Sequence, residues 1–231
     1  MKYRAVCFDI DGTLYPLSFL KKRVGHLALM HPFVTADYRK LRIELRKKQE
    51  EGDLNFDDLS FREKEASVYA ALSKTSPDEA RRNLDDKYYT YLAKEYSLLS
   101  EIPETRNTLL KIHKAGIRIG VFSDWPLFDK LTRIGIENLC DVITNSDTSG
   151  FLKPCPRAFD EMISKLGLPV SEILYVGDSY EKDVLGAVRA GMDAVLINPD
   201  CRKESDYPKA VKVCRTWKEF DEFATSLLEE E

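Results

Sequence analysis

Two aspartates follow a short apolar run near the start of the chain. Asp9 and Asp11 come directly after residues 5–8, and Gly12 follows them. Side chains of an extended segment alternate between its faces, so both carboxylates point the same way. Two ionised carboxylates this close repel each other unless a cation lies between them. Gly12 allows a sharp turn that brings main-chain N–H groups to the same place. Carboxylates together with N–H donors indicate a site for a metal-bound phosphate. Taken alone, the stretch also fits an ordinary Asp-Gly turn, or a helix capped by Asp9.

Composition places the chain among globular proteins of one or two domains. Its 231 residues are 43% hydrophobic and 32% charged, with a net charge of −4. Because charges of both signs are interspersed, we expect no nucleic-acid partner and no membrane-surface patch. No apolar run approaches the length of a membrane span, and we expect no signal peptide because an apolar strand-like run begins at residue 5. The five scattered cysteines lack a C-x-x-C pair, which predicts reduced thiols and a cytoplasmic location.

The elements that must position Asp9 and Asp11 fall into two kinds. Between residues 15 and 101, glycine is nearly absent and apolar residues recur at helical spacing, which predicts about four helices and no strand. We expect their charged faces, including residues 39–48 and 81–87, to be solvated. Beyond residue 101, apolar runs alternate with helical segments. Strands are expected at residues 117–122, 142–143, 173–176 and 194–197, and helices at 104–114, 127–134, 156–166, 181–190 and from 216 onward.

This alternation predicts an α/β fold with a doubly wound parallel sheet and helices on both faces. The helical segment then interrupts the fold directly after its first strand. We therefore expect a core domain of residues 1–14 and 102–231, and an inserted all-helical cap domain of residues 15–101.

Polar residues follow the apolar runs at the points where the strands end. Ser123 and Asp124 follow the second run, and Asp178 follows the run at 173–176, with Asp183 in the first turn of the next helix. Lys153 lies in the connection before another helix. Because ligands of open α/β sheets bind at the carboxyl ends of the strands, these side chains should converge with Asp9 and Asp11.

The order of these motifs resembles the haloacid dehalogenase superfamily of phosphohydrolases. Its D-x-D-G-T-L motif is matched at residues 9–14, and its strand ending in Ser or Thr is matched at Ser123. Its lysine motif, G-x-x-K-P-x-P, is matched at residues 150–156, and G-D-S with a later aspartate at residues 177–179 and Asp183. The resemblance implies a Rossmann-like core, and the insertion resembles the small helical cap of some members.

The resemblance also implies catalytic roles. Asp9 is expected to attack phosphorus and form an aspartyl-phosphate intermediate. Asp11 is expected to protonate the leaving alcohol and then to activate water as a base. Ser123 and Lys153 are expected to hold the oxygens of the transferred phosphoryl group.

Magnesium is the cofactor that the resemblance implies. Mg²⁺ is expected to be held by the Asp9 carboxylate, the main-chain carbonyl of Asp11 and the Asp178 carboxylate. Asp183 is expected to lie in the second shell or to act through a water molecule.

The sequence departs from the family pattern after Ser123. Many members carry asparagine next, whereas this chain has Asp124 followed by Trp125. We assign Asp124 no catalytic role and expect Trp125 to be an aromatic plug under the cap rather than a platform for the substrate.

These features predict a Mg²⁺-dependent phosphatase that hydrolyses a small phosphate ester, as a monomer or weak dimer. A phosphomutase of the same superfamily and a catalytically silent phosphate-binding regulator are the alternatives. A dehalogenase is disfavoured, because halide leaves without a proton and those enzymes lack the acid at the position of Asp11. Residues just after the first motif could reach the far end of the substrate, although solvated or core roles fit them equally well: Tyr15, Phe19, Lys21, Lys22 and Arg23.

Overall fold

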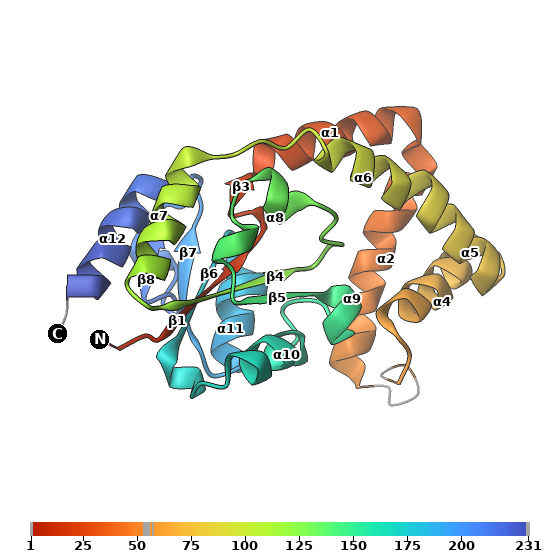
Figure 1. The fold of residues 1–231 in the computed structure, drawn as a ribbon. Helices are drawn as coiled ribbons and strands as arrows, with labels where there is room; N and C mark the ends of the chain where they lie inside the picture. The colour runs from red at the N-terminus through yellow and green to blue at the C-terminus, as the bar shows by residue number, and fades with distance from the viewer. Residues whose placement is uncertain (1, 53–55, 57, 230–231) are drawn as a thin grey trace.

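The structure, a computed structural model, describes residues 2–52, 56 and 58–229. Its core is a six-stranded parallel sheet in the order β5–β4–β1–β6–β7–β8. Because β1 lies between β4 and β6, the first motif lies near the middle of the sheet (Figure 1). The strands are β1 (Ala5–Asp9), β4 (Arg118–Ser123), β5 (Val142–Asn145), β6 (Ile173–Gly177), β7 (Asp193–Ile197) and β8 (Lys212–Cys214).

Helices cover both faces of this sheet. Val6 and Phe8 of β1 belong to one apolar cluster, together with residues of α7 and α12. Ala5 and Cys7 belong to a second cluster, together with residues of α10 and α11. Alternate residues of β1 thus contact opposite layers, which confirms the predicted doubly wound α/β fold. The covering helices are α7 (Pro103–Lys114), α10 (Arg157–Leu166), α11 (Leu185–Arg189) and α12 (Trp217–Glu229).

Several elements differ from the prediction. The helix expected at 127–134 is only α8 (Lys130–Arg133), because Phe128 has a positive φ of 47° and Gly135 follows with a φ of 76°. The helix expected at 181–190 begins as a wider π-helical turn, η4 (Tyr180–Val184), before α11. The edge strand β8 was not predicted, because its three residues are too few to show a period. Shorter elements are α9 (Ser146–Ser149), η2 (Glu137–Leu139), η3 (Val170–Glu172) and η5 (Glu204–Asp206).

A helical part lies between β1 and α7 in sequence and packs beside the core (Figure 1). The expectation that residues 15–101 hold no strand is wrong in one detail. Tyr15–Pro16 forms a two-residue strand, β3, that pairs with β2 (Asp11–Gly12) because the chain turns tightly between them. The helical elements are α1 (Leu17–Met30), α2 (Pro32–Glu51), α4 (Phe61–Ser73), α5 (Pro77–Asn83), η1 (Leu84–Tyr89) and α6 (Thr90–Tyr96).

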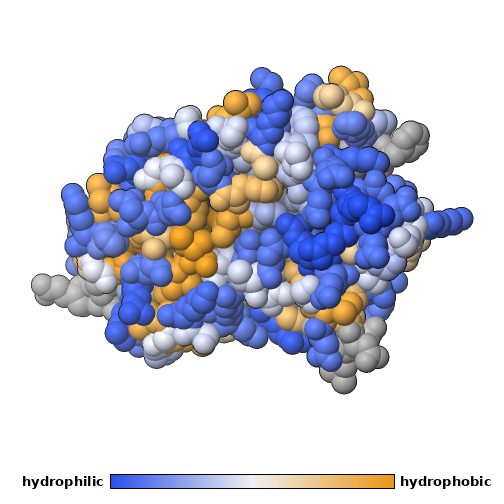
Figure 2. All heavy atoms as spheres, turned by 45° about the vertical axis from the view of Figure 1, so that its right-hand side comes forward, coloured by the Kyte–Doolittle hydropathy of each residue, from blue (hydrophilic) through white to orange (hydrophobic). Residues whose placement is uncertain are grey.

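The helical elements from α1 to α6 are called the cap below. Their charged faces are solvated only in part. Residues 81, 82 and 87 are exposed, as predicted, and hydrophilic residues cover most of the face shown in Figure 2. The expectation for residues 39–48 is wrong at two positions, because Arg42 is buried and Arg46 is half-buried against the core. Across the ranges that the structure describes, no helix has both the length and the apolar character needed to cross a membrane.

Candidate active site

The predicted nucleophile lies at the carboxyl end of the central strand. Asp9 is buried, and its Oδ1 lies 2.5 Å from the Nζ of Lys153, while its Oδ2 accepts a hydrogen bond of 2.8 Å from Thr13 Oγ1. Lys153 Nζ also lies 2.5 Å from Asp183 Oδ1. Burial lowers the pKa of Lys153, but the charges of Asp183 and Asp9 outweigh it and hold that pKa well above its usual value. Lys153 therefore stays cationic between two carboxylates.

Three carboxylates gather around the same point. Ligand oxygens of Asp9, Asp178 and Asp183 all lie within 4.8 Å of one another. Burial, with the charge of Asp183, raises the pKa of Asp178 to about 6, and burial also raises that of Asp9 well above its usual range. A Cβ atom at Gly12 would overlap the Asp178 carboxylate, so this close approach requires glycine at a φ of +106°.

These residues fit a divalent cation. The cluster offers oxygen donors only, which small, hard Mg²⁺ prefers. A cation would also relieve the repulsion between these carboxylates, which adds to burial in raising the pKa values of Asp9 and Asp178. We conclude that Asp9, Asp178 and Asp183 are suited to hold Mg²⁺.

Asp11 lies beside this cluster but turns its carboxylate toward a different set of groups. Lys130 Nζ lies 2.7 Å from Oδ1 and 3.0 Å from Oδ2, and Ser123 Oγ donates to Oδ2 at 2.5 Å. Tyr15 and Tyr96 donate their hydroxyl protons to Oδ1. Burial raises the pKa of Asp11, but the charge and hydrogen bonds of Lys130 outweigh it, so the pKa falls below its usual value. The Asp11 carboxylate is therefore ionised at neutral pH, and only its main chain remains a candidate metal ligand.

Lys130 and Tyr96 were not predicted to lie at the site. Lys130 is completely buried, and its ammonium lies 4.2 Å from the ring centre of Tyr96. Neither residue belongs to a recognisable motif. The one available signal was the place of Lys130 in the first helix after β4, which begins at the sheet edge where Asp11 lies.

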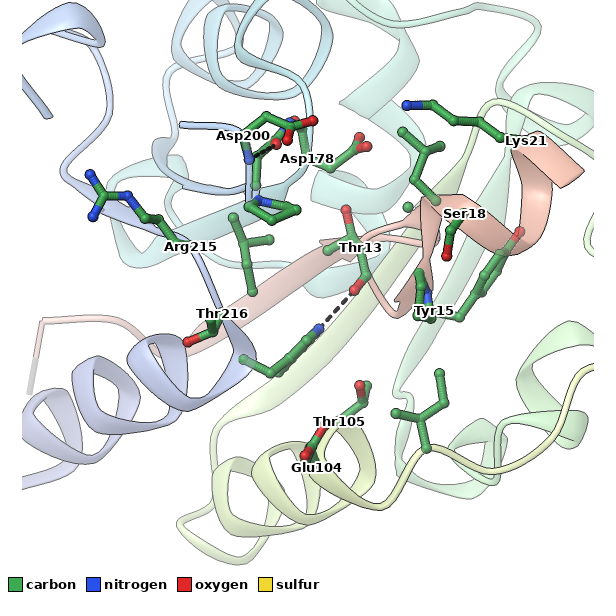
Figure 3. Close-up of a pocket in the computed structure, with 18 residues that line it drawn as sticks. Thr13, Tyr15, Ser18, Lys21, Glu104, Thr105, Asp178, Asp200, Arg215 and Thr216 are labelled. Carbon is green, nitrogen blue, oxygen red and sulfur yellow. Dashed lines mark hydrogen bonds between the residues drawn. The ribbon is translucent and has the colours of Figure 1, made fainter. Parts of the chain in front are cut away.

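Two cavities open beside Asp178. One, of about 510 Å³, is lined by Asp11 and Asp178 and by residues of η4. The other, of about 380 Å³, has Asp178 and Asp200 on one side and Glu104 and Thr105 on the opposite side (Figure 3). The second cavity is lined by Tyr15 and Pro16, where the chain leaves the core, and by Ile102, where it returns. It therefore lies at the junction of the core and the cap.

A larger cleft of about 980 Å³ lies between the cap and the core. Leu20, Trp125 and Lys182 line both this cleft and the cavity that contains Asp11, so the two adjoin. Lys21 and Arg39 also line it. Among the residues that the structure describes, the side-chain nitrogens of Lys21, Arg39 and Lys182 form no hydrogen bond or ion pair, so three exposed, unpaired cations line the cleft.

Asp124 does not point at the carboxylate cluster. Its Oδ2 lies 2.8 Å from Arg46 Nη2, and its Oδ1 accepts the N–H of Lys153 at 3.0 Å. Burial raises the pKa of Asp124, but neighbouring cations, first among them Arg46 and Lys153, lower it to about 2.

The neighbouring Trp125 packs beneath the cap. Its ring stacks on Tyr38, with centroids 5.4 Å apart, and on Tyr88, at 5.9 Å. These contacts match the expectation of an aromatic plug, although one edge of Trp125 also lines the cleft.

Comparison with known proteins identifies the family. A family model described as haloacid dehalogenase-like hydrolase matches residues 3–191. The chain belongs to the haloacid dehalogenase-like hydrolases. A glyceraldehyde 3-phosphate phosphatase of Methanothermobacter thermautotrophicus is 31% identical over 209 residues, covering 85% of this chain and 86% of that protein. A ribulose-1,5-bisphosphate 5-phosphatase of Halopiger xanaduensis is 25% identical over 230 residues, covering 94% of this chain and 93% of that protein.

Solved structures of haloacid dehalogenase-like hydrolases share the fold. The magnesium-bound putative HAD-hydrolase YfnB of Bacillus subtilis superposes with a TM-score of 0.68 and 19% identity, covering 97% of this chain and 100% of that one. These findings confirm the predicted family, the fold class and the assignment as a phosphatase-type enzyme of this family.

Proposed function

We propose that the protein is a Mg²⁺-dependent phosphomonoester hydrolase that works through an aspartyl-phosphate on Asp9. The observation that carries this proposal is the gathering of Asp9, Asp178 and Asp183 around Lys153, with Asp11 alongside. This arrangement supports the proposal, because a carboxylate that can act as a nucleophile, oxygen ligands suited to a cation and a positive charge lie close together beside the end of β1.

In the first half-reaction, a carboxylate oxygen of Asp9 attacks phosphorus and the bond from phosphorus to the ester oxygen breaks. For this step Asp11 must be in its carboxylic acid form, with a proton taken from water in the preceding turnover or from solvent, and it donates that proton to the departing oxygen. Lys153 stabilises negative charge on the phosphoryl oxygens, and Ser123 can donate to one of them once its hydroxyl turns away from Asp11.

In the second half-reaction, Asp11 takes a proton from a water molecule whose oxygen attacks phosphorus. The bond from phosphorus to Asp9 breaks, which releases inorganic phosphate and restores the Asp9 carboxylate. The pairing of Asp11 with Lys130 favours the ionised form that this step needs.

Asp9 and Asp178, with the main-chain carbonyl of Asp11, would hold Mg²⁺, and Asp183 would complete or support that shell. When bound, the ion reduces the repulsion between the Asp9 carboxylate and an anionic phosphate ester. Asp183, which also accepts an N–H from Ser179 at 2.9 Å, is fixed in position by its own chain turn.

The substrate we propose is a small phosphate ester of a sugar or short polyol. Relatives along most of the chain are named for a triose phosphate and for a pentulose bisphosphate. The cleft next to Asp11 can hold a leaving group of this size. Its unpaired Lys21, Arg39 and Lys182 favour, among such esters, those with a second anionic group.

A panel of small phosphate esters, assayed for Mg²⁺-dependent phosphate release, tests the proposal. Hydrolysis with a covalent phosphoryl group on Asp9 supports it. Return of the phosphoryl group to a sugar would indicate a mutase, and binding without turnover would indicate a regulator.

A further inference from the structure

We propose that Arg46 of the cap is a positioning residue for Lys153, so that docking of the cap completes the phosphoryl site. The inference rests on the proposed function, because it gives Lys153 a role in turnover. It concerns a residue that lines the cleft but forms no hydrogen bond or ion pair with Asp9, Asp178 or Asp183.

The main chain of Lys153 is held from both sides. Arg46 Nε donates to the carbonyl oxygen of Lys153 at 2.8 Å. The N–H of Lys153 donates to Asp124 Oδ1 at 3.0 Å, and the other oxygen of that carboxylate binds Arg46 Nη2 at 2.8 Å. One guanidinium therefore contacts the Lys153 peptide directly and through Asp124, which closes a ring of three residues.

Other cap side chains hold the segment that precedes Lys153. The N–H of Leu152 donates to Gln49 Oε1 at 3.2 Å, and the Nζ of Lys64 donates to the carbonyl oxygen of Gly150 at 3.0 Å. Gln49 and Arg46 both belong to α2, and Lys64 belongs to α4. The cap thus binds the Gly150 carbonyl, the Leu152 N–H and the Lys153 carbonyl, while core residues bind the other main-chain groups of residues 150–153.

Burial makes this arrangement energetically important. Lys153 is 2% exposed and Asp124 is 6% exposed, so few water molecules can replace a lost partner. Arg42, one turn before Arg46, donates to the carbonyl oxygen of Asp124 at 2.6 Å and fixes the same corner. If the cap moved away, the Lys153 peptide would lose the Arg46 bond, and Asp124 would lose its closest cation.

The consequence concerns the ammonium of Lys153, which lies 2.5 Å from both Asp9 and Asp183. A small shift of the Lys153 main chain moves this ammonium out of line with the phosphoryl oxygens. Misplacement by about 1 Å can cost about a hundredfold in rate. The cap therefore controls chemistry through the lysine as well as through access to the cleft.

The test compares Arg46→Met and Arg46→Lys with Lys47→Met, using steady-state kinetics on a small aryl phosphate with Mg²⁺. Lys47 is the exposed neighbour on α2, and its ammonium pairs only with Glu51 among the described residues. We expect Arg46→Met to lower kcat by about tenfold to a hundredfold, with KM changed less than about threefold. The kcat of Arg46→Lys should lie between those of the wild type and Arg46→Met. The lysine keeps a positive charge near Asp124 but cannot also bind the Lys153 carbonyl. Lys47→Met should match the wild type.

A Lys153→Ala background separates positioning from a general structural role. If Arg46 acts through Lys153, Arg46→Met causes no further loss of kcat in that background. An equal loss in both backgrounds, or an unchanged kcat in Arg46→Met alone, overturns the proposal.

Amide hydrogen exchange over residues 150–153 provides a readout that needs no turnover. We expect faster exchange at Lys153 in Arg46→Met and in Asp124→Asn, and unchanged exchange in Lys47→Met. Unchanged exchange in both variants contradicts the proposal that Arg46 positions Lys153. A wild-type protein without phosphatase activity contradicts the proposed function only. Asp124→Asn keeps the test open if Arg46→Met does not fold.

Discussion

Lys130 Nζ lies 2.7 Å from Asp11 Oδ1, and no part of the Lys130 side chain reaches solvent. This pair joins a helix that follows β4 to the acid of the first motif. It lowers the pKa of Asp11, so it favours the carboxylate that activates water over the carboxylic acid that protonates the leaving group. The pair is thus tuned to the second half-reaction.

Replacing Lys130 tests this relationship. Lys130→Met leaves the buried Asp11 carboxylate with hydroxyl donors only, so we expect a loss of about 3–5 kcal/mol in unfolding free energy at neutral pH. The folded pKa of Asp11 is lowered in the wild type and should be raised in the variant. The difference between the two proteins should therefore shrink as the pH falls toward about 4, as followed by urea unfolding.

Arg133→Met is the control on the same helix, because Arg133 pairs with Asp129 at the surface. We expect Arg133→Met to lower the unfolding free energy by less than about 1 kcal/mol at every pH. A Lys130→Met protein as stable as this control would mean that the buried pair contributes nothing to the fold.

Asp178 should make magnesium binding depend on pH. Its pKa is raised to about 6, so it becomes protonated as the pH falls below that value and can no longer serve as an anionic ligand. We expect the Mg²⁺ affinity, measured by calorimetry, to fall by about tenfold or more between about pH 7.5 and about pH 5. Asp178→Asn should bind weakly at both values, and an unaltered affinity in this variant would remove Asp178 from the metal site.

Asp9→Asn should keep the fold and abolish covalent phosphorylation, because an amide cannot act as the nucleophile. We expect turnover to drop by about a thousandfold or more. Asp11→Asn should still form some aspartyl-phosphate but hydrolyse it slowly. Acid-quenched mass spectrometry of each variant measures the phosphorylated fraction. If Asp9→Asn remained active and a different residue carried the phosphoryl group, Asp9 would not be the nucleophile.

Asp124 should contribute stability that disappears in acid. Its pKa of about 2 lies below the usual value of 3.8, so its contribution is complete above about pH 4 and is lost as the pH falls toward 2. The shift corresponds to about 2 kcal/mol. The unfolding free energies of wild type and Asp124→Asn should therefore converge over this range, and a gap independent of pH would contradict the stabilisation of the Asp124 carboxylate by Arg46 and Lys153.

The cations of the cleft should select for charge at the far end of the substrate. We expect Arg39→Met to lower kcat/KM by about threefold to tenfold for esters with a second phosphate or carboxylate, and by less than twofold for neutral esters. Lys40→Met, at the next position on α2, serves as the control because Lys40 does not line the cleft. Equal losses for both classes of ester would mean that Arg39 does not contact the distal group.

The sequence alone determined the fold class and the six candidate residues. Strand-like runs ended at Asp9, Ser123 and Asp178, and parallel strands carry their carboxyl ends to one edge whatever the details of packing. The resemblance to the haloacid dehalogenase superfamily then supplied the roles, which remain proposals residue by residue.

Only the tertiary structure decided which groups surround those residues. Lys130 and Tyr96 meet Asp11 from distant segments, and Arg46, expected to be solvated, holds the Lys153 peptide. Helical periodicity reports which face of a helix is apolar. It does not reveal when a charged residue on the other face finds a buried partner, because that depends on how the cap packs against the core.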